Sequence, residues 1–363
     1  MAGDSAGDPL HDCGLRRDRR PYARMIGRHG ARLTSAATAR RQMPACLLLS
    51  VVLIACCVAS AQTAAKIQTV TGPIDPSDLG PTLAHEHVLV DFIGADQVSP
   101  ARYDADEVFA RMLPYLQDLR AAGIATLVEC TPEYLGRDPL LLRRLSEASG
   151  IRILTNTGWY KDPFLPPFAH EATAEQIAER WIREATEGIG EARIRPGFIK
   201  IAANEGDLSE VQRKIVTAAA LTSQATGLVI ASHTTQGLTA LQELDVLAEV
   251  GVPAERFIWV HADAEPSADL HWQAAARGAW IEYDGIREAN AGEKLPLVQE
   301  ALRRIPDQLL ISQDAGWYHV GEPNGGEVTP LDWLPRHFAP RLADADRERL
   351  LIANPARAFC IRG

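Results

Sequence analysis

The feature that most limits the possible folds is a regular alternation of short apolar runs with longer amphipathic segments from Gln62 onward. Short runs rich in β-branched residues are typical of buried strands, whereas apolar residues at three- and four-residue spacing are typical of helices. The strand-like runs cover residues 83–91, 124–131, 151–157, 197–202, 228–233, 257–261, 279–284 and 309–314. This alternation predicts eight βα units.

The segments between the runs agree with this interpretation. In 104–122 apolar residues recur at helical spacing before an Ala-Gly end, and 209–225 has the same character. Eight βα units over about 300 residues favour a (β/α)8 TIM barrel in a single domain, 62–363. A Rossmann fold would need a glycine fingerprint after an early strand, which this sequence lacks. Segment 67–81 is expected to form a hairpin or cap at the barrel's amino end.

Residues 1–61 have the pattern of an N-terminal extension with an export signal. The apolar stretch 47–55 follows Arg40 and Arg41 and is succeeded by Ala59-Ser60-Ala61, which predicts cleavage after Ala61 and a periplasmic or secreted protein. The stretch is too short for a transmembrane helix.

Other forms of processing stay open. Residues 53–56 match a lipoprotein box, in which case a lipid on Cys56 would hold the protein at a membrane, and the arginine pair matches a degenerate twin-arginine signal. Met25 and Met43 are alternative starts.

Charge and cysteine content narrow the class of partner. Nine Arg and four Asp lie in 1–61, so the rest of the chain keeps 28 of the 37 basic and 43 of the 47 acidic side chains, a balance of −15. This balance argues against a nucleic-acid partner.

Of the six cysteines only Cys130 and Cys360 lie beyond the extension, and both are predicted to be buried free thiols.

Several strand-like runs end in a side chain that can bind a metal ion. His233, His261 and Asp314 each stand at the end of a run, and in a barrel the carboxyl ends of the strands form the active face. The first run contains His85 and His87, which project to the same side of a strand because strand side chains alternate, while the intervening glutamate projects to the other side.

Lys200 is a charged group inside an otherwise apolar run, and a buried lysine needs a partner or must lose its charge. Each of these residues has an ordinary alternative: a strand-end histidine in the core, an aspartate capping a turn, or a lysine that reaches an ion pair at the surface. Their joint placement on five strands favours a metal centre.

The motifs, taken in order, resemble the phosphotriesterase family of the amidohydrolase superfamily. The resemblance spans essentially all of 62–363 and rests on Thr82-Leu-Ala-His-Glu-His, Gly197-Phe-Ile-Lys, Ala231-Ser-His-Thr, Val260-His-Ala-Asp, Ser312-Gln-Asp and Asn354-Pro-Ala-Arg.

This resemblance implies a (β/α)8 barrel with two divalent metal ions, usually zinc. It places His85, His87 and Asp314 on the more buried ion, His233 and His261 on the more exposed ion, and Lys200 between them as its carbamate, N6-carboxylysine. Carboxylation would turn a buried cation into an anionic oxygen ligand, which suits zinc and similar ions.

The implied reaction is hydrolysis of an ester bond in a small molecule, namely a lactone, a carboxylic ester or a phosphotriester. The two ions would lower the pKa of a bridging water, the resulting hydroxide would attack the polarised P=O or C=O, and Asp314 would take the proton. Lactonase members place a tyrosine near the metals at the position of Tyr160, which otherwise packs a loop. Trp317 would begin the eighth loop, which shapes the leaving-group pocket. Dimers are common among relatives, so a homodimer stays open.

One motif departs from the lactonase pattern. Those members tend to carry an Asp-Arg pair after the seventh strand, whereas here Asp284 is in register and Arg287 is displaced, which weakens homoserine-lactone specificity. Hydrolysis of an amide bond stays open because the site would polarise any carbonyl. A non-catalytic exported binding protein is the other alternative, but it would not need all six ligand positions.

Overall fold

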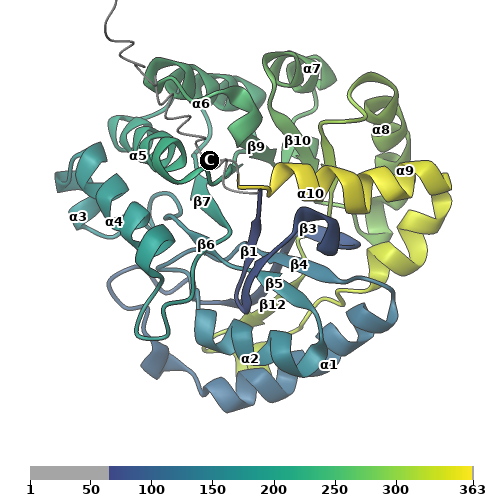
Figure 1. The fold of residues 1–363 in the computed structure, drawn as a ribbon, viewed down its shortest axis with the longest axis horizontal. Helices are drawn as coiled ribbons and strands as arrows, with labels where there is room; N and C mark the ends of the chain where they lie inside the picture. Colours follow the sequence, from purple (N-terminus) through teal and green to yellow (C-terminus); the bar gives the residue numbers. More distant parts are fainter. Residues whose placement is uncertain (1–64, 362–363) are drawn as a thin grey trace, which may run out of the picture. The chain divides into compact units, whose positions relative to one another are not determined.

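The computed structural model describes residues 65–361. The predicted export signal, with Cys56 and the cleavage site at Ala61, lies outside the described residues. The described part is an α/β fold in which helices lie around the outside of the strands (Figure 1).

The strands form two parallel sheets. One has the order β12 (Gly316–His319), β3 (Thr82–Val90), β4 (Thr126–Glu129) and β5 (Arg152–Leu154). The other has the order β6 (Asn156–Thr157), β7 (Phe198–Ala202), β8 (Ile230–His233), β9 (Phe257–Val260), β10 (Trp280–Tyr283) and β11 (Leu309–Ile311). The parallel α/β fold is therefore confirmed, and the predicted run 151–157 is divided between β5 and β6.

The two sheets meet at two places. Only Thr155 separates β5 from β6 along the chain. Beyond β11, the amide of Asp314 donates to the carbonyl of His85 at 3.1 Å, and the amide of His87 donates to the carbonyl of Ala315 at 2.9 Å. This arrangement is consistent with a TIM barrel, although the two ladders do not form one continuous closed ring.

The helices lie mainly between successive strands in the chain. They are α1 (Ala105–Ala121), α2 (Pro139–Ser149), α3 (Phe168–Glu171), α4 (Ala174–Glu187), α5 (Glu210–Thr226), α6 (Gly237–Val250), α7 (Ala268–Arg277), α8 (Ala291–Arg304), α9 (Asp344–Glu348) and α10 (Asn354–Ala358). The helices predicted in 104–122 and 209–225 are α1 and α5. Within 65–361, no helix combines the length and the apolar character needed to cross a bilayer.

Local sequence sets the helix ends. The Asp104 side chain accepts the amide protons of Asp106 and Glu107 at the start of α1. Ser209 and Gln212 form a capping box at the start of α5. Both arrangements satisfy amides that have no partner inside the helix.

The strand β12 was not predicted. Trp317 was expected to begin the eighth loop, but residues 316–319 pair in parallel with β3, with Gly316 opposite His87 and Tyr318 opposite Leu89. Gly316 has φ +95°, and a Cβ there would lie 1.9 Å from the carbonyl oxygen of His87. Only glycine allows the two strands to approach so closely at this point.

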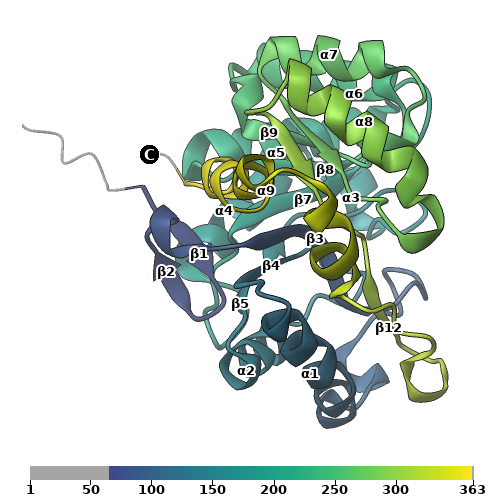
Figure 2. The ribbon, with the colours of Figure 1, turned by 90° about the vertical axis from the view of Figure 1, so that its right-hand side faces the viewer.

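The segment after Ala65 forms the predicted hairpin. Strands β1 (Ile67–Thr69) and β2 (Gly72–Ile74) pair antiparallel, and the amide of Val70 donates to the carbonyl of Ile153 at 2.9 Å. Ile153 lies in the short strand β5, and the hairpin covers the amino ends of the strands (Figure 2).

Alternating side chains divide the core in two. Phe198, Ile258 and Leu310 belong to a smaller cluster among the strands. Their neighbours Ile199, Trp259 and Leu309 belong to a larger cluster that includes the apolar faces of the helices. Lys200 has the same parity as Phe198, so the fold places its charged group among the strands.

Candidate metal centre

All eight predicted site residues line one small cavity of about 50 Å³. They are His85, His87, Tyr160, Lys200, His233, His261, Asp314 and Trp317. His85 and His87 lie within β3, Lys200 lies within β7, and His233 ends β8. Trp317 belongs to β12, and the other three follow β6, β9 and β11. The structure therefore brings these eight side chains together around one cavity.

One group of possible metal ligands consists of His85, His87 and Asp314. The Nε2 atoms of the two imidazoles are 3.3 Å apart, and His87 Nε2 is 3.2 Å from Asp314 Oδ1. The Nδ1 atom of His87 lies 2.8 Å from the hydroxyl of Thr131. With a proton on Nδ1, the opposite Nε2 presents a lone pair toward Asp314.

The atoms of this group fit a cation. Asp314 Oδ1 is buried and has no hydrogen-bond partner. Two imidazole nitrogens and a carboxylate oxygen converge on one point, and all their ligand atoms lie within 4.8 Å of one another. Nitrogen and oxygen donors of this kind suit zinc and related divalent ions.

A second group joins His85 and His261 to Asp284, and its ligand atoms also lie within 4.8 Å of one another. The sequence analysis gave Asp284 no role in binding. The sequence did contain a signal for such a role, because Asp284 ends a strand-like run and directly follows β10. Asp314 and His261, which were predicted to bind metal, have the same kind of position after β11 and β9. His233 extends the same cluster, since its ring centroid is 4.3 Å from that of His261.

Lys200 is the other unusual member of the site. Its side chain is 2% exposed, and Nζ has no hydrogen-bond partner. A buried ammonium without a partner is costly. The position fits a lysine whose nitrogen is modified or lies against a bound group.

Burial keeps most of the imidazoles neutral. It lowers the pKa of His85 to about 3, and the nearby Lys200 charge adds to this effect. Burial also lowers the pKa of His87 and, together with His261, holds the pKa of His233 well below its usual range. Neutral imidazoles keep the lone pair that a metal ion requires.

The two aspartates of the site, Asp314 and Asp284, are ionised. Burial alone would raise the pKa of Asp314, but His87 and His85 lower it to about 2. Burial alone would likewise raise the pKa of Asp284, but His261 and His85 hold it well below its usual range. The cluster therefore contains two carboxylates near neutral pH.

Three site residues have a left-handed backbone. His261 has φ +62°, Asp314 φ +52° and Trp317 φ +73°. Non-glycine residues seldom adopt this conformation, and it persists where surrounding contacts fix it. The strained positions coincide with the cluster.

Aromatic side chains surround the cavity. The Tyr160 hydroxyl lies 3.2 Å from the His233 ring nitrogens, and Trp317 packs on His87 with ring centroids 3.9 Å apart. Phe92 contacts Trp317 and Phe164. An apolar entrance of this kind favours a substrate with apolar parts.

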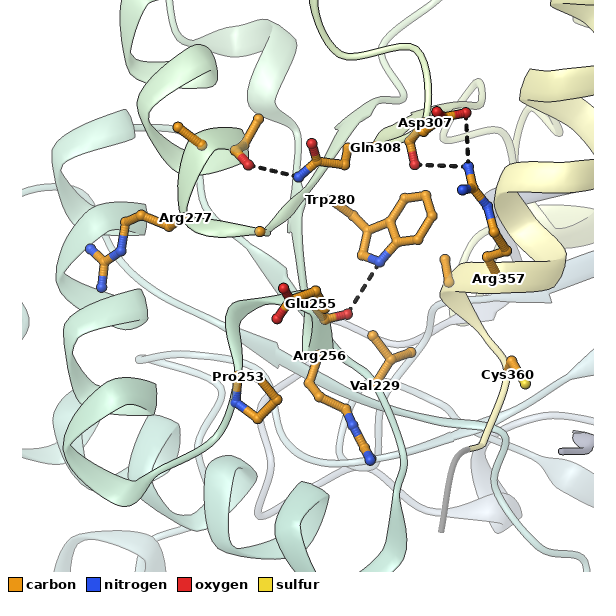
Figure 3. Close-up of a pocket in the computed structure, with 14 residues that line it drawn as sticks. Val229, Pro253, Glu255, Arg256, Arg277, Trp280, Asp307, Gln308, Arg357 and Cys360 are labelled. Carbon is orange, nitrogen blue, oxygen red and sulfur yellow. Dashed lines mark hydrogen bonds and ion pairs between the residues drawn. The ribbon is translucent and has the colours of Figure 1, made fainter. Parts of the chain in front are cut away.

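A larger concavity, of about 710 Å³, lies at the amino ends of β8 to β11 (Figure 3). Trp280 lies at its centre and donates its indole N–H to the Glu255 carbonyl at 3.2 Å, while Arg357 bonds to Asp307. The predicted site residues do not line this concavity. Its one thiol, Cys360, is half-buried, which corrects the expectation that it is fully buried; Cys130 is buried as predicted.

A parallel α/β fold with clustered histidines and aspartates at its strand ends is the arrangement of a metal-dependent hydrolase. The pattern that defines the phosphotriesterase family matches residues 65–359, so the chain belongs to this family.

Individual relatives have different activities in their names. The phosphotriesterase homology protein of Escherichia coli (strain K12) is 28% identical over 295 residues, covering 78% of this chain and 99% of the relative. The aryldialkylphosphatase of Saccharolobus solfataricus is 30% identical over 212 residues, covering 58% of this chain and 68% of the relative. The N-acetyltaurine hydrolase of Xenopus tropicalis is 26% identical over 248 residues, covering 60% of this chain and 71% of the relative.

Proposed function

We propose that this protein is a binuclear, zinc-dependent hydrolase of ester bonds in small molecules, with a lactone, a carboxylic ester or a phosphotriester as substrate. The observation that carries the proposal is the convergence of His85 Nε2, His87 Nε2 and Asp314 Oδ1 beside the unpartnered Nζ of Lys200. The aryldialkylphosphatase relative supports the choice of ester bonds. The proposal includes closure of the two sheets into one (β/α)8 barrel.

The proposed ligands divide into two sets. His85, His87 and Asp314 hold one ion, His233 and His261 hold the other, and Lys200 binds both as N6-carboxylysine. When bound, the two ions supply an activated water and polarise the bond to be cleaved.

The protein's own groups perform the remaining tasks. Asp314 is ionised and reaches the centre of the cluster, so it can receive the proton that the water loses. Asp284 accepts from His261 and fixes its tautomer. Tyr160 donates toward the substrate oxygen from its place beside His233, and Trp317 forms a wall of the leaving-group pocket.

A second candidate is hydrolysis of an amide bond in an anionic substrate. The Arg287 guanidinium lies 3.1 Å from the Asp314 carbonyl oxygen, and 53% of its side chain is exposed. An exposed guanidinium beside the cluster favours a carboxylate or sulfonate group on the substrate. The N-acetyltaurine hydrolase relative supports this candidate.

Export is also a proposal. The basic pair at Arg40 and Arg41, the apolar stretch 47–55 and the Ala-Ser-Ala pattern support cleavage after Ala61. The N-terminal sequence of the protein recovered from the periplasm or the medium would identify the cleavage site. A lipid on Cys56 would contradict simple cleavage.

The test of the main proposal compares kcat/KM of zinc-loaded protein, prepared with bicarbonate, on an aliphatic δ-lactone and a diethyl aryl phosphotriester. Turnover of either substrate that is lost in His261→Ala, with the fold retained by circular dichroism, supports an ester hydrolase. Turnover confined to anionic N-acyl amides supports the second candidate. Tight ligand binding without turnover of any of these would favour a binding protein and contradict both candidates.

A further inference from the structure

Glu86 stands between His85 and His87 in β3 but faces the opposite side of the strand. Its side chain is fully buried. It accepts four hydrogen bonds, all from the short segment 312–315, and the longest, from the Gln313 side-chain amide, is 3.5 Å. Oε1 accepts from the Ser312 hydroxyl at 2.8 Å and from the Gln313 amide at 3.1 Å. Oε2 accepts from the Ala315 amide at 2.7 Å.

These bonds hold the residues on both sides of Asp314. Gln313 precedes it and Ala315 follows it, and the amides of both point to the same carboxylate. The amide of Asp314 itself donates to the carbonyl of His85 at 3.1 Å. The backbone of Asp314 is therefore fixed from β3 at three successive residues.

Asp314 needs such support because of its conformation. Its φ of +52° lies in the left-handed region, which non-glycine residues adopt at a cost. Its Oδ1 atom makes no hydrogen bond, and its carboxylate has only looser contacts, with His87 Nε2 at 3.2 Å and with the exposed Arg287 guanidinium at 3.7 Å. The direction of this side chain therefore depends on how firmly its backbone is held.

We propose that Glu86 is a positioning residue that fixes the 312–315 segment and so aims the Asp314 carboxylate at His85 and His87. The proposal rests on the proposed metal centre. One side of β3 supplies two ligands, and the glutamate between them sets the position of the third. A single strand thus determines the geometry of the whole His85–His87–Asp314 group.

A second set of contacts supports the segment from outside. The Gln313 side chain donates to the Leu331 carbonyl at 2.7 Å and accepts from the Leu334 amide at 2.6 Å. These bonds hold Gln313 but not Ala315. Loss of the Glu86 carboxylate should therefore loosen the Ala315 side of Asp314 more than the Gln313 side.

Replacement by glutamine keeps the shape of the Glu86 side chain and removes one of its two acceptor oxygens. In Glu86→Gln one oxygen still accepts, but the amide nitrogen cannot accept from the other donors. In Glu86→Ala all the bonds are lost. The 312–315 segment should therefore be held less firmly in Glu86→Gln than in the unaltered protein, and least firmly in Glu86→Ala.

The direct test is amide hydrogen exchange of the metal-free protein, which requires neither substrate nor metal. Exchange at Ala315 should be faster in Glu86→Gln and faster still in Glu86→Ala. The control is Ser223→Ala, which removes a buried hydrogen bond to the Leu228 carbonyl at the other end of the strands. This control should leave exchange at Ala315 unchanged.

The second readout is zinc affinity, measured by competition with a chelator. In Glu86→Gln the dissociation constant of one ion should rise about 10- to 100-fold, the usual effect of losing a group that orients a ligand. On the substrate identified for the protein, kcat of Glu86→Gln should fall while KM changes little. Glu86 projects from the side of β3 opposite His85 and His87 and does not line the cavity. Ser312→Ala removes one donor to Glu86 and also the acceptor of the His85 amide. It should give a smaller effect of the same kind at Ala315 and serves if the Glu86 variants fail to fold.

The outcomes separate this proposal from the proposed function. Normal exchange at Ala315 and unchanged zinc affinity in Glu86→Gln or Ser312→Ala would overturn the positioning role. A lower melting temperature with neither change would show that Glu86 serves stability alone. If the unaltered protein binds no zinc, the proposed function fails, while the exchange experiment still decides whether Glu86 holds the segment.

Discussion

His261 and Asp284 are joined by two contacts. The backbone amide of His261 donates to Asp284 Oδ2 at 3.1 Å, and its ring Nδ1 lies 2.6 Å from Asp284 Oδ1. Asp284 Oδ2 also lies 3.0 Å from His85 Nδ1. One buried carboxylate therefore contacts two imidazoles, and that of His85 also lies 3.2 Å from Glu282.

The first prediction follows from these contacts. Asp284→Asn keeps the shape of the side chain but removes the charge that fixes the Nδ1 proton of both imidazoles. We expect kcat/KM to fall about 10- to 100-fold, the usual cost of losing a carboxylate behind a ligand histidine. Steady-state kinetics and zinc content per chain are the measurements. Full activity at full zinc content would refute this role.

The second prediction concerns Lys200. Lys200→Met keeps an unbranched stem of similar size but cannot be carboxylated. We expect the variant to bind fewer than two zinc ions per chain, whereas zinc uptake by the unaltered protein should increase with bicarbonate. Elemental analysis gives the zinc content, and the mass of the intact native protein should show one added carbon dioxide. Zinc uptake that is independent of both bicarbonate and Lys200 would argue against the carbamate.

The third prediction concerns Tyr160. Tyr160→Phe keeps the ring and removes the hydroxyl beside His233, so we expect kcat/KM to fall about 10-fold, or about 1.4 kcal/mol. The matched control is Tyr103→Phe, which removes a hydroxyl that donates to Asp138 at 2.7 Å outside the cavity. Equal effects of the two substitutions would mean that Tyr160 only packs its loop.

The fourth prediction concerns the pH dependence of stability. Burial raises the pKa of Glu129 from 4.5 to about 7. A carboxyl whose pKa is higher in the folded protein contributes stability below pH 4.5 and loses it as the pH rises through 7. Relative to Glu129→Gln, the metal-free protein should lose about 3 kcal/mol of unfolding free energy over this range. Urea unfolding at pH 4 to 8 measures it, and parallel curves for both proteins would contradict it.

The positions of the site residues were predictable because they depend on local pattern. A strand has a period of two, so the parity of His85, His87 and Lys200 could be read from short runs. The carboxyl ends of parallel strands meet at one face of the fold, so residues at the ends of separate runs come together. No knowledge of distant contacts was needed for either step.

The features that escaped prediction depend on partners far along the chain. Strand β12 forms because 316–319 meets β3 more than 200 positions earlier, and its Gly-Trp start has positive φ angles that are typical of loops. The role of Asp284 depends on its contact with His85, which is equally remote. The half-buried Cys360 precedes Ile361, whose bridge to Lys66 joins the two ends of the described chain.

The size of the cavity has a consequence for how such a protein can diverge. A cavity of about 50 Å³ has room for a few water molecules but is much smaller than the roughly 300–1,000 Å³ of typical ligand pockets, so most of a larger substrate must rest on the segments outside the strands. The Tyr160 segment, where a Cβ at Gly158 would lie 2.0 Å from the Lys200 carbonyl oxygen, is anchored tightly at its base. Beyond such anchor points, loop sequences are free to vary without altering the chemistry. Directed evolution toward new substrates should therefore select substitutions in these loops and leave the strands intact.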